Sequence, residues 1–147
     1  MKNSNKILYS VSGNIAILTI NRPERRNALD AETLQQINII LDRAESDEKV
    51  RVILITGQGD TFSSGFDLKD QMEKAPKGKE WKSILELDHR TIMRFWNSPK
   101  PTIAAVRGAC LAGGFELSLA CDFTICSKDS FFGEPELKFG AGIVTML

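Results

Sequence analysis

The sequence is poor in the residues that build metal centres and disulfide frameworks. Its 147 residues include one histidine, His89, and three cysteines, Cys110, Cys121 and Cys126. None of the cysteines has the CxxC spacing of a zinc site, and their odd number does not suit a set of disulfides. We therefore expect no metal site. Reduced thiols that pack as small apolar residues, in a cytoplasmic compartment, are the simplest interpretation.

An excess of either charge is also missing. Nineteen Lys and Arg residues balance nineteen Asp and Glu residues. A neutral chain has no general attraction to nucleic acid or to anionic lipid, so neither is expected as a partner. No apolar run has the length of a membrane-spanning helix, and the first six residues do not resemble a secretory signal. The length and the hydrophobic fraction of 42% suit one globular domain over residues 1–147.

Apolar patterning predicts strands and helices in alternation. A helix over 31–46 is expected to begin at Asp30 as its N-cap and to bury Leu34, Ile37, Leu41 and Ala44. A second long helix is expected over 80–97, and the residues after 56 are expected to form a long loop. The other expected elements are strands over 6–11, 15–20, 50–56, 102–106, 123–126 and 131–132, and a short helix over 113–120. This order predicts an α/β domain whose strands are mostly joined by helical crossovers.

Two glycine-bearing segments follow predicted strands. The first, from Gly57, begins as a GxG dinucleotide-binding fingerprint, but Phe62 occupies the third glycine position, which argues against that fold. The second leads through Gly113-Gly114 into the short helix. Free N–H groups at a helix start suit an anion or an oxyanion, and the same small residues also suit tight helix–strand packing.

Glu116 and Glu136 stand in otherwise apolar segments twenty positions apart. A carboxylate among Leu, Phe and Ala is costly to bury without a partner or a task. If the fold brings the two together, each raises the pKa of the other, and one can hold a proton near neutral pH. The pair would then supply a general acid and a general base. The alternatives are a solvent-facing helix residue for Glu116 and a loop salt bridge for Glu136.

Several short motifs occur in a fixed order along essentially the whole chain. They are Asn21-Arg22-Pro23, Asn27-Ala28-Leu29, Phe62-Ser63-Ser64-Gly65-Phe66-Asp67-Leu68, the Lys100–Gly108 segment, Gly113-Gly114-Phe115-Glu116, Ala120-Cys121-Asp122 and Phe132-Gly133-Glu134-Pro135-Glu136. In this register the sequence resembles the crotonase family, also called the enoyl-CoA hydratase/isomerase superfamily. The resemblance implies an α/β fold with a spiral ββα core, from which the C-terminal helical part of the family is missing.

The resemblance also implies an enzyme, an acyl-CoA lyase that reversibly adds water to a 2-enoyl-CoA thioester. By motif position, the backbone N–H groups of Phe66 and Gly113 form an oxyanion hole for the thioester enolate. Glu116 resembles the residue that activates water, and Glu136 resembles the residue that delivers a proton to the α-carbon. No metal or redox cofactor is implied, because coenzyme A enters as part of the substrate. An enoyl-CoA isomerase, or another crotonase-type reaction, is the alternative enzyme.

Contacts with substrate and coenzyme A are implied for Arg25, Ser64, Phe66, Leu68, Lys69 and Gly113, although Arg25 and Lys69 equally suit solvated surface charges. Phe66 replaces a residue that is often small in the family, so its ring is expected to reshape the acyl pocket. Full-length relatives work in fatty acid metabolism and form homo-oligomers, trimers or hexamers. The apolar end at 140–147 leads us to expect a fragment with little activity alone. A non-catalytic acyl-CoA-binding module is the alternative of another class.

Overall fold

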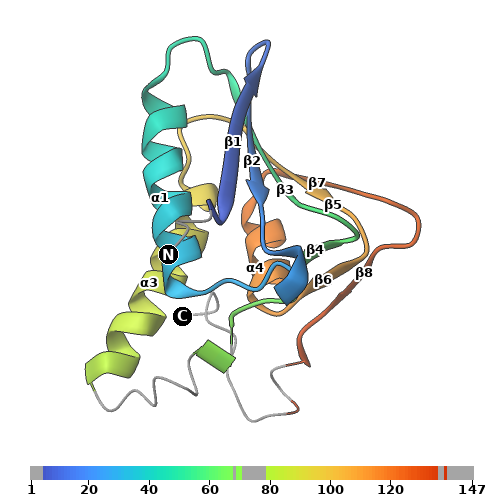
Figure 1. Cartoon of the computed structure of the whole chain (residues 1–147). Coiled ribbons are helices and arrows are strands. Elements are labelled where there is room, and N and C mark those ends of the chain that lie inside the picture. The colour runs from blue at the N-terminus through green and yellow to red at the C-terminus, as the bar shows by residue number, and fades with distance from the viewer. Residues whose placement is uncertain (1–4, 68, 71–78, 136–137, 139–147) are drawn as a thin grey trace.

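A five-stranded sheet forms the centre of the computed structural model, which describes residues 5–67, 69–70, 79–135 and 138 (Figure 1). The strand order is β1-β2-β3-β5-β7, with β1 antiparallel to β2 and every other pair parallel. The strands are β1 Ile7–Ser12, β2 Ile15–Ile20, β3 Val52–Gly57, β5 Thr102–Val106 and β7 Phe123–Cys126. The predicted turn at Gly13 joins β1 to β2, and its φ of +59° explains the glycine.

A second, three-stranded parallel sheet lies beside the first. Its order is β4-β6-β8, with bounds β4 Thr61–Ser63, β6 Ala109–Leu111 and β8 Phe131–Gly133. Each of these short strands follows one strand of the main sheet along the chain, as the predicted spiral ββα core requires. The expectation of one long loop after residue 56 was wrong at β4, and β6 was not predicted. Three residues are too few to show the period of a strand.

Helices join the parallel strands. Helix α1, Ala31–Ser46, and helix α3, Lys79–Trp96, contact each other along one side of the main sheet (Figure 1). Helix α4, Gly113–Ala120, contacts α3 and strands of both sheets. The sequence predicted these bounds to within one residue. A 3₁₀ turn over Pro23–Arg25 lies within the expected loop.

The start and the apolar face of α1 follow the sequence closely. A carboxylate oxygen of Asp30 accepts the N–H of Thr33 at 2.8 Å, so Asp30 is the predicted N-cap. The predicted face is buried: Leu34, Ile37, Leu41 and Ala44. The helix therefore contributes to the core through one stripe, and Ile39 on another face is 67% exposed.

Two of the three cysteines are buried, as expected, and the third is not. Burial raises the pKa of Cys110 to about 11 and that of Cys121 to about 12, so both thiols stay protonated at neutral pH. Cys126, at the end of β7, is exposed, which corrects the expectation of a core residue. Within the described ranges, no helix is long and apolar enough to cross a membrane.

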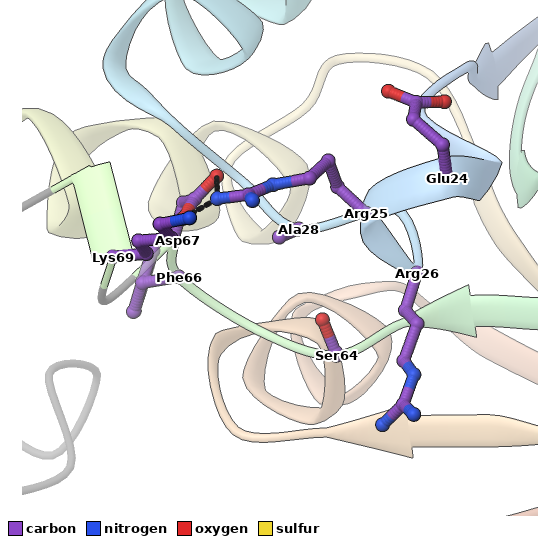
Figure 2. A pocket seen from close by; sticks show the side chains of 8 residues that line it. All are labelled: Glu24, Arg25, Arg26, Ala28, Ser64, Phe66, Asp67 and Lys69. Atoms are coloured by element: carbon purple, nitrogen blue, oxygen red, sulfur yellow. Dashed lines mark hydrogen bonds and ion pairs between the residues drawn. The ribbon is translucent and has the colours of Figure 1, made fainter.

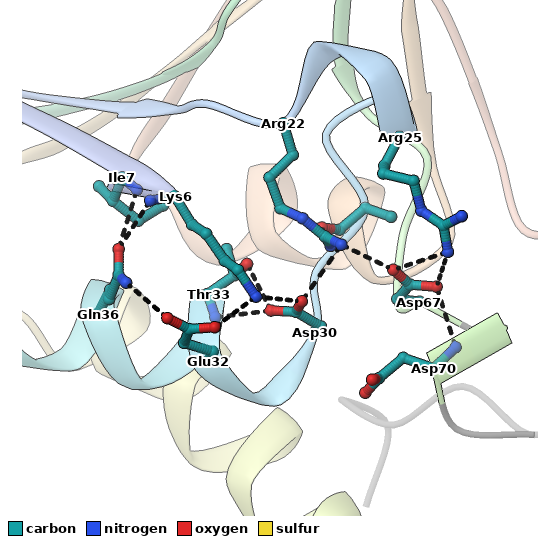
Figure 3. A network of polar contacts seen from close by, with 11 residues as sticks. Lys6, Ile7, Arg22, Arg25, Asp30, Glu32, Thr33, Gln36, Asp67 and Asp70 are labelled. Atoms are coloured by element: carbon teal, nitrogen blue, oxygen red, sulfur yellow. Dashed lines mark hydrogen bonds and ion pairs between the residues drawn. The ribbon is translucent and has the colours of Figure 1, made fainter. Parts of the chain in front are cut away.

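The loop after β2 and the segment after β4 line a common pocket of about 380 Å³ (Figure 2). Ion pairs between charged side chains connect the two segments (Figure 3). Arg22 is within 3.2 Å of Asp30 and within 3.0 Å of Asp67, and Arg25 is within 3.1 Å of Asp67. Lys6, the residue before β1, joins the network because its Nζ lies 2.6 Å from Oδ2 of Asp30.

These contacts fix the charge of both aspartates. Burial by itself would raise their pKa values, but the contacts outweigh it. Hydrogen bonds from Lys6 and Thr33, with the charge of Arg22, bring the pKa of Asp30 below its ordinary value. The backbone N–H of Asp70 and the two arginines do the same for the pKa of Asp67. Both carboxylates are therefore ionised at neutral pH.

Acid is expected to weaken this network. Because the folded-state pKa of Asp67 is depressed, its stabilising contribution is present above the ordinary value and is lost as pH falls through the folded value. We expect the melting temperature of the wild type to fall below about pH 4, and to fall less in Asp67→Asn. Circular dichroism melts from pH 7 to pH 3 measure this, with exposed Asp60→Asn as the control. Parallel curves for wild type and Asp67→Asn would contradict the assignment.

The stripe on α1 generates a second prediction. Leu41 is fully buried, so Leu41→Ala should reduce the free energy of unfolding by about 2–5 kcal/mol. Ile39→Ala, on the exposed face of the same helix, should change it by less than about 0.5 kcal/mol. Urea unfolding followed by circular dichroism measures both. Equal losses in the two variants would show that α1 does not pack as described.

Candidate active site

Asn27 holds the loop after β2 in place. Its φ of +54° lies in the left-handed region, which asparagine adopts more readily than most residues. The side chain is buried, accepts the N–H of Arg22 at 3.0 Å and donates to the carbonyl of Thr61 at 2.6 Å. One amide thus fixes both the shape of this loop and its distance from β4.

The segment after β4 carries Phe66 past that loop. The carbonyl of Gly65 accepts the N–H of Leu29 at 2.8 Å, and the backbone N–H of Asp67 donates to the carbonyl of Leu29 at 2.9 Å. Successive N–H groups of an extended chain point to opposite sides. The N–H of Phe66 therefore points away from Leu29.

Gly65 brings this segment against the start of α4. It has φ +94°, and a Cβ built on it would lie 2.4 Å from the Cβ of Ala112 and 3.2 Å from the backbone nitrogen of Gly113. Real Cβ atoms do not approach so closely, so only glycine permits this contact. Phe66, the next residue, is therefore held beside the first turn of α4.

The first turn of α4 begins with two glycines whose N–H groups have no partner within the helix. The carbonyl of Ala112 accepts from Phe115 at 2.7 Å and from Glu116 at 3.0 Å, so hydrogen bonding within the helix begins after the two glycines. Ala112, the N-cap of α4, has φ +54°, which is a strained value for alanine. A Cβ built on Gly113 would lie 2.5 Å from the ring of Phe66. The two predicted oxyanion donors, Phe66 and Gly113, are thus neighbours in space.

Glu116 is buried in the first turn of α4 and only 2% exposed, so the solvent-facing alternative for this residue was wrong. A second buried carboxyl, Asp88, comes from α3, which packs against α4. Burial raises the pKa of Asp88 to about 7, and the nearby charge of Glu116 contributes to the rise. The sequence analysis missed Asp88, although its spacing from Ile92 and Phe95 places it on the apolar face of α3.

The pocket of Figure 2 gathers most of the residues predicted to bind coenzyme A. Its described lining is Glu24, Arg25, Arg26, Ala28, Ser64, Phe66, Asp67 and Lys69. Within this lining, the guanidinium of Arg25 donates a hydrogen bond to Asp67. The side chain of Arg26 points away from Arg25 (Figure 2). The sequence analysis did not predict Arg26 as a site residue. Gly113 and Glu116 do not belong to this lining, and the predicted Leu68 and Glu136 lie outside the described residues.

The charge of the pocket suits an anion. Arg25, Arg26 and Lys69 contribute three cations against Glu24 and Asp67, and Asp67 is already engaged by Arg22 and Arg25. Guanidinium and ammonium groups in such an arrangement bind phosphate oxygens. Across the described part of the chain, no cluster of three His, Cys, Asp or Glu residues has a geometry that would hold a metal ion.

Comparison with known proteins agrees with this geometry. The family model for enoyl-CoA hydratase/isomerase matches residues 10–145. A probable enoyl-CoA hydratase of Bacillus subtilis is 41% identical over 137 residues, which are 92% of this chain and 52% of that protein. A short-chain-enoyl-CoA hydratase of Clostridium acetobutylicum is 34% identical over the same shares of the two chains.

A solved structure extends the comparison to three dimensions. The enoyl-CoA hydratase/isomerase of Xanthobacter autotrophicus Py2 is 60% identical and superposes with a TM-score of 0.94, over 95% of this chain and 52% of that one. The chain thus spans about half the length of the relatives it matches. The resemblance read from the motifs is confirmed, and the chain belongs to the enoyl-CoA hydratase/isomerase family, the crotonase superfamily.

Proposed function

We propose that the protein containing this chain catalyses the reversible addition of water to a 2-enoyl-CoA thioester. The observation that carries this proposal is the close approach of Gly65 to Ala112, which brings Phe66 against Gly113 at the start of the helix that bears the buried Glu116. The names of the relatives, hydratases of enoyl-CoA, support the same chemistry.

The two N–H groups act as the oxyanion hole. When the oxygen of water bonds to the β-carbon, the electrons of the carbon–carbon double bond move toward the thioester carbonyl. Negative charge then collects on the thioester oxygen. Fixed donors at Phe66 and Gly113 stabilise this charge more than they stabilise the neutral substrate, so they lower the barrier. The donors need no reorganisation, because the two loops are already locked together.

Glu116 acts as the general base. Its carboxylate accepts one proton from water as the oxygen–carbon bond forms. Its burial suits this role, because an apolar environment disfavours the charged form and strengthens a carboxylate as a proton acceptor. Glu136 is proposed to return a proton to the α-carbon of the enolate, which completes the addition. No metal or redox cofactor takes part in these steps.

The pocket of Figure 2 is proposed to hold part of the coenzyme A moiety. Arg25, Arg26 and Lys69 contribute cations to this lining that suit phosphate, and Arg25 is also paired with Asp67. The ring of Phe66 packs over Gly113, where it narrows the space beside the thioester. We therefore expect Phe66 to restrict the acyl group. Family membership supports three further proposals. Leu68 contacts coenzyme A, the protein assembles as a trimer or hexamer, and it works in fatty acid metabolism.

Removing the proposed base tests the mechanism. Glu116→Gln keeps the shape of the side chain but cannot accept a proton, so the kcat for hydration should fall by about 10²–10⁴-fold. The loss of absorbance of a short enoyl-CoA measures the rate, and the binding affinity for acyl-CoA should change little. The control is Glu86→Gln, an equal loss of charge at an exposed position of α3.

The outcomes separate the alternatives. Full hydration by Glu116→Gln would remove this residue from the scheme. Migration of the double bond without water addition by the wild type would identify an isomerase. Binding of acyl-CoA with no turnover by the wild type would identify a non-catalytic module.

A second prediction concerns the oxyanion hole. Gly65→Ala places a methyl group on the Cβ of Ala112, so the two loops must separate and one donor moves out of position. We expect kcat/KM to fall by about 10²-fold or more. Gly13→Ala is the matched control, because it has a similar positive φ but nothing within 4 Å of the added Cβ. It should lower the melting temperature and leave kcat/KM unchanged. An active Gly65→Ala enzyme would contradict the assignment of the donors.

A further inference from the structure

Asp88 is a buried acid to which the hydration scheme gives no task. It lies on the inward stripe of α3 with Thr91, Ile92 and Phe95, and it is 3% exposed. Its Oδ2 has no hydrogen-bond partner among the described residues. A buried carboxylate without a partner is costly, so a group kept in this state stays protonated or shares a proton with a neighbour.

The titratable groups found near Asp88 among the described residues are acidic. Glu116 approaches from α4, close enough for its charge to act on Asp88. On another side, Asp88 lines a small cavity of about 50 Å³ with Asp30 and Asp70, where the remaining lining is Leu29, Ala31, Ile84 and Leu87. The cavity has room for water. No cation belongs to this described lining, and the cations Lys6 and Arg22 are bound to Asp30.

We propose that Asp88 and Glu116 form a carboxyl pair that holds one proton between α3 and α4, and that Asp88 is a positioning residue which sets the protonation of Glu116. The part of this proposal that concerns catalysis rests on the proposed hydration. Two like charges in one apolar space cannot both be present at low cost, so the pair prefers a single negative charge.

The pair would match the needs of the reaction. Below about pH 7, where burial and the charge of Glu116 place the pKa of Asp88, the shared proton resides on Asp88, and Glu116 is the carboxylate that accepts a proton from water. As pH rises above this value, the shared proton is lost. The two protons belong to the pair, so a change at either residue alters the titration of the other.

Carboxyl titration by NMR tests the pair directly. The protein containing this chain, labelled with ¹³C at aspartate carboxyl groups, should show one aspartate that titrates near pH 7. Asp88→Asn should abolish this titration. Glu116→Gln should shift it to lower pH, because the neighbouring charge is gone while burial remains, and Glu86→Gln should leave it unchanged. A titration near pH 7 that persists in Asp88→Asn, or does not respond to Glu116→Gln, would overturn the pair.

Kinetics test the positioning role. The wild type should show an inflection in kcat near pH 7, and Asp88→Asn should lack it while KM stays within about twofold. An unchanged pH profile in Asp88→Asn would overturn this role. The titration uses no substrate, so its result stands even if the protein does not hydrate enoyl-CoA. Failure of the pair and failure of the proposed reaction are therefore distinguishable.

Thermal melts control for folding. Because the folded-state pKa of Asp88 is raised, its stabilising contribution is complete below the ordinary pKa near 4 and is lost as pH rises through about 7. Asp88→Asn should therefore gain melting temperature relative to the wild type between pH 5 and pH 8. A relative loss over this interval would overturn the burial of an acidic group that the pair requires.

Discussion

The close approach of two backbone segments at Gly65 and Ala112 is the constraint on which the site depends. It places Phe66 against Gly113, so two residues from segments almost fifty positions apart become neighbours, and their N–H groups are the proposed oxyanion donors. Neither segment could keep this geometry alone, because one is a loop and the other is the strained entry to a short helix. The ββα spiral supplies the support, since β4 and β6 pair just before Phe66 and Gly113 in the chain.

Charged and amide side chains stabilise the position of the loop after β2 relative to β4 and to the segment that follows it. Arg22 joins Asp30 to Asp67, and Asn27 fixes the loop between them against β4. The network thus connects the cap of α1 with the residue that follows Phe66. Ion pairs of this kind contribute little when exposed, but here the aspartates are buried and each accepts several hydrogen bonds. They fix the position of the loop that carries Phe66, a proposed oxyanion donor.

The sequence predicts the parts of this structure that have a clear period or a local signal. Helix α1 has an apolar stripe and an aspartate cap, and β5 is a short apolar run, so their bounds were correct. The strands β4 and β6 have neither signal, because three residues stabilised by distant partners leave no pattern. Asp88 was missed for a related reason. Its proposed role depends on the charge of Glu116, which lies on another helix and twenty-eight positions further along the chain, and no local feature indicates that interaction.

A structure of the protein bound to a non-reactive enoyl-CoA analogue would test the central claim most directly. The account predicts that the thioester oxygen lies about 2.7–3.1 Å from the backbone nitrogens of both Phe66 and Gly113, with Glu116 facing the β-carbon. A thioester oxygen that contacts neither nitrogen, or a β-carbon turned away from Glu116, would contradict it.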